Sequence, residues 1–167
     1  MAREIERKFL LKGTEWKDLA HKKTHLAQAY LNDIKNDNSP KSSIRIRIEG
    51  DKANINIKSL EIGISRDEYE YSINLDDAKK MIDTLAVGPV IEKYRYLVKY
   101  DNYLWEIDEF LGNNNGLIVA EVELESEEEQ PNLPTWVARE VTEITRYYNI
   151  SLSQKPYNQW TKDEQNF

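Results

Sequence analysis

The sequence predicts a mainly β, α+β fold in which about eight antiparallel strands form a barrel or a sandwich, with helices packed on the outside. Three observations support this fold class. Apolar and charged residues alternate with a period of two along most of the chain. The 10 Tyr and 4 Trp favour strands. The length of 167 residues suits one domain over 1–167, and only 6 Gly and 5 Pro leave little room for long linkers.

The first expected strand covers residues 4–11. Glu4, Glu6 and Lys8 share one face, and the other face is apolar except for Arg7. This alternation is typical of a half-buried strand.

A short helix is expected at 14–22, with Trp16 and Leu19 facing inward. A weaker strand pattern follows at 25–32, and the turn residues at 36–41 predict a loop.

The remaining strands are expected at 43–49, 54–58, 66–73, 92–100, 103–110 and 117–124. Between the two halves, residues 76–86 repeat apolar side chains at helical spacing, which predicts a helix that Gly88-Pro89 ends. The barrel strands would thus span about 3–125. After a polar linker at 126–134, helix signals at 134–144 open a C-terminal helical segment of about 134–167.

Composition excludes several kinds of protein. The net charge of -7 and the pI of about 5.0 argue against non-specific binding to nucleic acid or to an anionic membrane. No apolar run approaches the roughly 20 residues that span a bilayer. Cys is absent, which rules out disulfides and agrees with a cytoplasmic protein. There is no Walker A motif, and two His residues do not support a Ser-His-Asp triad. A homodimer stays an open possibility.

The charged faces of the strands are sorted by sign. Acidic pairs at i, i+2 are Glu4/Glu6, Glu68/Glu70, Glu106/Asp108 and Glu121/Glu123, and basic residues are Lys8, Arg45, Arg47, Lys58, Arg66, Lys93 and Arg95. Two carboxylates at this spacing lie roughly 6.5–7 Å apart on one strand face, where pairs from neighbouring strands can surround a hard divalent cation. Paired guanidinium groups suit a row of phosphates.

The simplest alternative is that each charged face is only the solvated face of an antiparallel sheet. Opposite charges on adjacent strands could also be ordinary cross-strand pairs. However, these faces use Arg and Glu in paired blocks, whereas a solvated face uses Thr, Ser and Gln freely. If the charged side lines a lumen, metal ions and a polyphosphate would supply the partners that buried charges need.

The order of these motifs resembles that of the CYTH superfamily, the triphosphate tunnel metalloenzymes. The motifs resembling it, in order along nearly the whole chain, are Glu4-Ile5-Glu6-Arg7-Lys8, Arg45-Ile46-Arg47, Lys58, Arg66 with Glu68-Tyr69-Glu70, Lys93-Tyr94-Arg95, Trp105 to Phe110, Ala120 to Leu124, Glu140-Val141-Thr142 and Tyr148-Asn149. The resemblance implies an eight-stranded, closed antiparallel barrel that forms a tunnel.

The resemblance also implies an activity: metal-dependent hydrolysis of a triphosphate, above all of inorganic tripolyphosphate to pyrophosphate and phosphate. Two alternatives within the family are a class IV-type adenylate cyclase, which makes cyclic AMP from ATP, and a thiamine triphosphatase. A module that binds polyphosphate or nucleotide without turnover is the alternative outside enzymes.

The site residues follow from the same resemblance. Mg²⁺ or Mn²⁺ would be held by Glu4, Glu6, Glu121 and Glu123, with Asp108 and Glu70 as ligands of second rank. The triphosphate would be bound by Lys8, Arg45, Arg47, Lys58, Arg66, Lys93 and Arg95. The residues expected to act in catalysis are Glu4, Glu6, Lys8, Glu70 and Asp108.

Overall fold

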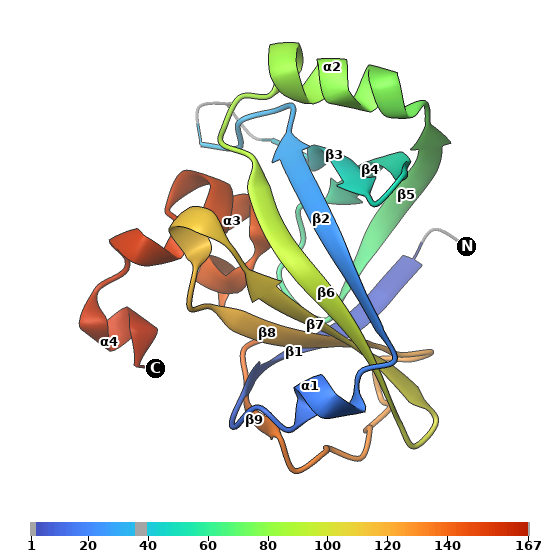
Figure 1. Ribbon diagram of the computed structural model, residues 1–167, viewed down its shortest axis with the longest axis vertical. Helices are drawn as coiled ribbons and strands as arrows, with labels where there is room; N and C mark the ends of the chain where they lie inside the picture. Colours follow the sequence, from blue (N-terminus) through green and yellow to red (C-terminus); the bar gives the residue numbers. More distant parts are fainter. Residues whose placement is uncertain (1–2, 36–39, 167) are drawn as a thin grey trace.

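The computed structural model describes residues 3–35 and 40–166 (Figure 1). Most of the loop predicted at 36–41 lies outside the described residues. The strands are β1 (Arg3–Leu11), β2 (Lys22–Tyr30), β3 (Ser42–Glu49), β4 (Lys52–Ser59), β5 (Ser65–Ile73), β6 (Ile91–Tyr100), β7 (Tyr103–Phe110), β8 (Ile118–Glu123) and β9 (Val137–Glu140). The helices are α1 (Trp16–Leu19), α2 (Leu75–Leu85), α3 (Asn149–Gln154) and α4 (Lys162–Gln165), with short 3-10 turns η1 (Gly112–Asn114), η2 (Thr145–Tyr147) and η3 (Tyr157–Gln159).

The first eight strands form a closed antiparallel barrel, which confirms the predicted fold class. Their order around the barrel is β5-β4-β3-β2-β6-β7-β8-β1, and pairing of β1 with β5 closes the ring. β1 lies between β5 and β8: Glu4 pairs with Arg66 of β5, and Glu6 pairs with Glu123 of β8. Closure removes the free sheet edges that eight strands would otherwise expose.

The helix predicted at 134–144 is wrong. This stretch instead contains β9, which pairs with β1 through Phe9↔Glu140 and Leu11↔Val137. β5 pairs only with residues 3–5 of β1, so the rest of that edge of β1 has unpaired backbone groups, and β9 satisfies them. Burial of Trp136 and Val137 adds to the strand pairing. The segment after residue 134 is therefore a strand followed by short helical turns, and not a helical segment throughout.

The two outer helices pack as short covers on the barrel. α1 is a single turn whose Trp16 is fully buried and meets Tyr96 edge to face at 5.1 Å. The prediction that Leu19 faces inward is wrong: it is 57% exposed, because one turn presents only one side chain to the barrel. Figure 1 shows α2 lying across the upper end of the barrel, where it packs on β3 and β4. The Asn74 side chain caps α2 by accepting from the amide groups of Asp76 and Asp77.

Three apolar clusters pack against the barrel wall, two on its outside and one on its inside. The outward face of β1 packs with residues of β7, β8 and the loops into an outer core, which contains Phe9, Trp16, Trp105, Val122 and Trp136. A second, smaller core lies under α2. The third cluster joins inward-facing residues of the strands (Tyr30, Ile91, Phe110 and Val119) to the C-terminal segment (Val141, Tyr147, Ile150, Leu152 and Trp160). The C-terminal segment therefore closes one part of the barrel interior with apolar side chains. None of the helices in the described part of the chain combines the length and apolar character needed to cross a membrane.

Candidate functional site

A cavity of about 790 Å³ occupies the barrel interior. The charged side chains that line it are Glu4, Glu6, Lys8, Arg45, Arg47, Glu49, Lys58, Glu61, Arg66, Glu68, Glu70, Arg95, Glu106, Glu121 and Glu123. The charged faces of the strands therefore point inward, and the solvated-face alternative is wrong for this chain. All predicted site residues line the cavity except Lys93 and Asp108.

Strand periodicity explains why these charges meet. On β6, Ile91, Lys93 and Arg95 share one face, and on β7 the same face carries Phe110 and Asp108. On β6 and β7 the inward face thus has an apolar residue in the cluster under the C-terminal segment at one end, followed by charged residues. The period of two fixes the face, and the apolar ends of these two faces lie where the cavity stops.

Lys93 and Asp108 form a fully buried pair behind the cavity wall. The Lys93 Nζ lies 2.6 Å from Asp108 Oδ2, and Arg95 donates to both Asp108 oxygens at 2.8 and 2.9 Å. Burial opposes ionisation of Asp108, but the charges of Arg95 and Lys93 outweigh it and hold its pKa at about 2. Burial also lowers the pKa of Lys93 to about 7, helped by Arg95 and Arg47. As the side chains stand, Asp108 orients Arg95 and does not reach the cavity.

Carboxylates gather on β1 and β8. Glu4 accepts two hydrogen bonds from the Lys58 Nζ at 3.0 and 2.8 Å, and Glu121 lies 3.2 Å from the Lys8 Nζ. Burial, and after it the charges of Glu121 and Glu4, raise the pKa of Glu6 to about 8. Glu6 therefore marks a concentration of negative charge inside the barrel.

This carboxylate group suits a divalent cation in its chemistry. Within residues 3–35 and 40–166, no three His, Asp or Glu side chains are arranged as a metal site, and lysines contact Glu4 and Glu121. The cavity lining offers carboxylate oxygens and no His, and the chain has no Cys. Hard cations such as Mg²⁺ or Mn²⁺ prefer such oxygen donors. A cation here would also relieve the repulsion that raises the pKa of Glu6.

The opposite side of the barrel carries two arginines without acidic partners. Arg45 and Arg47 are 5% and 9% exposed, and no carboxylate of the described residues forms an ion pair with either. The Arg45 Nε has no hydrogen-bond partner, and the Arg47 Nε donates only to the Gln28 side chain. Burial lowers the pKa of Arg47 most, the charges of Arg45 and Arg95 lower it too, and the resulting value is about 10. A buried positive charge without compensation is the arrangement that binds an anion.

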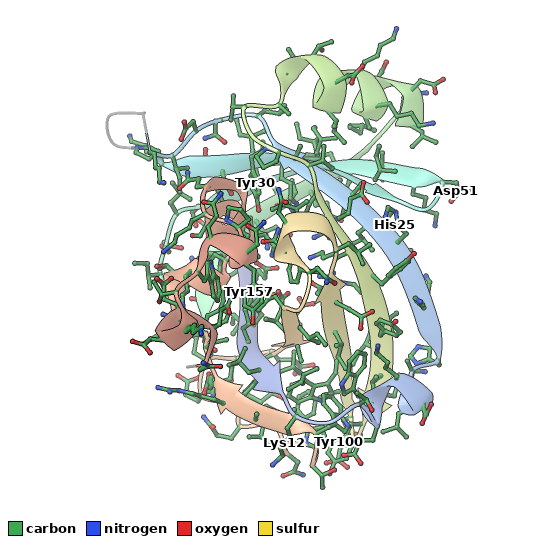
Figure 2. The ribbon with its side chains drawn as sticks, turned by 60° about the vertical axis from the view of Figure 1, so that its left-hand side comes forward. Lys12, His25, Tyr30, Asp51, Tyr100 and Tyr157 are labelled. Carbon is green, nitrogen blue, oxygen red and sulfur yellow. The ribbon has the colours of Figure 1, made fainter. Side chains whose placement is uncertain are left out.

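The C-terminal segment contributes residues to the site, including Tyr148, for which the sequence analysis expected a motif but no role. The Tyr148 ring lies 5.5 Å from the Lys8 Nζ and 5.1 Å from the Arg66 Cζ, and its hydroxyl donates to the Thr142 carbonyl oxygen. The Lys8 Nζ also donates to the Tyr147 carbonyl oxygen. Figure 2 shows Tyr157 within this segment and Tyr30 beside it, away from His25 and Asp51. The segment therefore covers the cavity and holds two of its cations.

Two polar, uncharged residues, Gln28 and Asn56, were missed, and no role was expected of Asn149 beyond its place in a motif. Gln28, Asn56 and Asn149 lie on or behind the cavity wall, where Asn56 donates to Glu68 and Glu70. Glu106 lines the cavity and pairs with Arg95. For Gln28 and Asn56 the available sequence signal was their position on the inward face of β2 and β4. Arg7, by contrast, lies outside the cavity, where it contacts Gln130 and Glu140.

Comparison with known proteins agrees with this arrangement. The sequence matches the CYTH domain over residues 2–157. It is 41% identical over 157 residues to an inorganic triphosphatase of Acetivibrio thermocellus, covering 94% of this chain and 97% of that protein. It is 36% identical over 155 residues to an inorganic triphosphatase of Nitrosomonas europaea, covering 90% of this chain and 96% of that protein.

Solved structures show the same fold. The crystal structure of an inorganic triphosphatase superposes with a TM-score of 0.60 at 32% identity, covering 92% of this chain and 95% of that one. A Pyrococcus horikoshii protein has a TM-score of 0.57 at 16% identity, covering 75% and 80% of the two chains, which shows a shared fold alone. The domain match and the two relatives cover most of the sequence. The chain therefore belongs to the CYTH domain family.

Proposed function

We propose that this protein is an inorganic triphosphatase that hydrolyses tripolyphosphate to pyrophosphate and phosphate with a divalent metal ion. One observation carries the proposal: a single cavity places two buried arginines, which form no ion pair with any described carboxylate, opposite a cluster of carboxylates. A polyanion and a cation bound together would balance both sides. The inorganic triphosphatases at 41% and 36% identity support this choice of substrate.

The basic residues would bind the phosphate chain. Arg45 and Arg47 have guanidinium groups free of carboxylates, so each can give two parallel hydrogen bonds to phosphate oxygens. Lys8, Lys58, Arg66 and Arg95 line the same cavity. Lys93, behind the wall, would act by fixing Asp108 and Arg95.

The carboxylates would hold Mg²⁺ or Mn²⁺ through Glu4, Glu6, Glu121 and Glu123, with Glu70 and Asp108 as further candidates. When bound, such an ion neutralises phosphate charge and polarises a phosphoryl oxygen. Lys58 and Lys8 would then exchange Glu4 and Glu121 for phosphate oxygens, so their charges would help to stabilise the leaving pyrophosphate.

Positioning would supply most of the rate enhancement, as in other phosphoryl transfers. The barrel strands hold the cations on a rigid frame, and the apolar cluster under the C-terminal segment limits how far the phosphate chain can slide. A terminal phosphoryl group held in one place and one orientation is prepared for in-line attack by water.

The test is a panel of tripolyphosphate, ATP and thiamine triphosphate, assayed with Mg²⁺ or Mn²⁺. Phosphate, pyrophosphate and cyclic AMP are detected separately. We expect the highest kcat/KM with tripolyphosphate and release of both phosphate and pyrophosphate. Cyclic AMP from ATP would identify a cyclase instead. Thermal stabilisation by tripolyphosphate without turnover would identify a binding module.

A further inference from the structure

Two uncharged amide side chains link cations on separate strands. Gln28 on β2 is fully buried, and its Oε1 accepts from the Arg47 Nε at 3.2 Å. Its Nε2 donates to the Asn149 Oδ1 at 3.1 Å, and the same oxygen accepts from the Lys93 Nζ at 3.3 Å. A continuous chain of hydrogen bonds therefore runs from β3 through β2 and the start of α3 to β6.

The topology places both amides where they can make this link. β2 lies between β3 and β6, and Gln28 pairs with Arg47 on one side and with Ile91 on the other. Asn149 begins α3, whose Ile150 and Leu152 are buried in the cluster that closes the barrel interior. The apolar anchoring of α3 fixes Asn149 at the cavity wall.

The chemistry of the two ends fixes the orientation of both amides. Lys and Arg side chains can only donate hydrogen bonds. Because the Arg47 guanidinium has no acceptor, Gln28 must turn its oxygen to Arg47 and its NH₂ group to Asn149, whose oxygen also faces Lys93. A fully buried amide in any other orientation would leave polar atoms without partners.

An amide holds a cation without neutralising it. A carboxylate in the place of Gln28 would form an ion pair with Arg47 and compete with a phosphate for the same guanidinium. Lys8, Lys58 and Arg95 all have carboxylate partners, whereas Arg47 has Gln28. Arg47 therefore keeps its full positive charge and still has one fixed geometry.

We propose that Gln28 and Asn149 are positioning residues of the triphosphate site, which hold Arg47 and Lys93 in place while leaving the charge of Arg47 free for a phosphate group. This inference rests on the proposed triphosphatase function. It also assigns the start of α3 a role in the site, because Asn149 couples that helix to both basic strands.

The deciding variant is Gln28→Glu, which keeps an acceptor for Arg47 and adds a charge. We expect KM for tripolyphosphate to rise by about tenfold or more, the size expected for a weakened charged hydrogen bond. The unfolding temperature should match that of the wild type or exceed it, because the new carboxylate compensates Arg47. The matched control is Gln130→Glu, since Gln130 accepts from Arg7 at 3.2 Å outside the cavity, and its KM should not change.

A second comparison separates positioning from general stability. In an Arg47→Met background, Gln28→Glu should cause no further rise in KM, because the guanidinium it acts on is gone. Should Gln28→Glu not fold, Asn149→Asp makes the same test at a half-buried position beside Lys93. An unchanged KM in the folded Gln28→Glu or Asn149→Asp variant would overturn the inference, as would an equal rise in the Arg47→Met background.

Failure of the proposed function gives a different result. If the wild type releases no phosphate from tripolyphosphate, that function is wrong, and Kd values for tripolyphosphate from calorimetry replace KM in the same comparison. Loss of affinity in Gln28→Glu would then still support the positioning role. A wild type that neither binds nor hydrolyses tripolyphosphate would refute both proposals.

Discussion

Two sides of the same cavity compensate their charges in opposite ways. On the paired side, cations and carboxylates contact each other directly: Lys8 with Glu121, Lys58 with Glu4, and Lys93 and Arg95 with Asp108. On the arginine side, Arg45 and Arg47 on β3 have no carboxylate of the described residues as an ion-pair partner. The cations of the paired side have carboxylate partners without a ligand, whereas those of the arginine side depend on an incoming anion. The difference predicts that substitutions on the two sides change activity and stability in different ways.

Removal of divalent cations should reduce the rate of tripolyphosphate hydrolysis more than any single substitution does. With EDTA we expect phosphate release from tripolyphosphate to fall by at least about 1,000-fold, because neutralisation of the phosphate charge is lost. The barrel should stay folded by circular dichroism, since lysines already compensate Glu4 and Glu121. Added Mg²⁺ or Mn²⁺ should restore the rate. Full activity in EDTA would show that the carboxylates on the paired side do not serve a metal ion.

Asp108→Asn should destabilise the fold more than any other single change proposed for the cavity. Asp108 is fully buried and accepts from both Lys93 and Arg95, so its loss leaves two buried cations without their shared partner. Breaking such a buried pair costs about 3 kcal/mol or more of unfolding free energy. Urea denaturation measures this directly, with Asp67→Asn, an exposed partner of Arg3, as the control. A loss below about 1 kcal/mol, the usual value for a surface pair, would mean that the pair is not buried in solution.

Glu4→Gln and Glu6→Gln should reduce kcat/KM by about 100-fold, the effect of losing one well-placed electrostatic contact. The metal concentration needed for half-maximal rate should rise as well. Glu140→Gln is the matched control, because Glu140 lies near Arg7 outside the cavity. Equal rates for wild type and both cavity variants would remove Glu4 and Glu6 from the metal assignment.

Arg45→Met and Arg47→Met should raise KM by about tenfold, because each removes a charged hydrogen-bond donor to phosphate. Their unfolding temperatures should equal or exceed that of the wild type, since the arginine side loses a charge that has no acidic partner. Arg3→Met, whose arginine pairs with Glu61 and Asp67, should leave KM unchanged. A marked loss of stability in the Arg45 and Arg47 variants would show that the two sides of the cavity are compensated alike.

Sequence reasoning recovered the eight barrel strands because a period of two marks a strand wherever one face is apolar. It also selected the residues that line the cavity, although only the resemblance to a known family turned the charged face inward. It missed β9, since the pairing of Val137 and Glu140 with β1 is a tertiary contact that local propensity does not encode. The roles of Gln28 and Asn149 depend on which strands become neighbours, and a single chain of letters does not reveal this.

The pairing of β1 has a consequence for how the protein folds. β1 joins Glu4 to Arg66 and Glu6 to Glu123, so the ring closes through contacts between positions far apart along the chain. Such contacts slow folding, because a large loop entropy must be overcome before they form. The acidic cluster exists only after β1 has joined both of its neighbours, since Glu6 and Glu121 come from β1 and β8, and Glu4 lies where β1 meets β5. Ions that bind this cluster should therefore stabilise only the completed ring, and they should slow its opening more than they speed its formation.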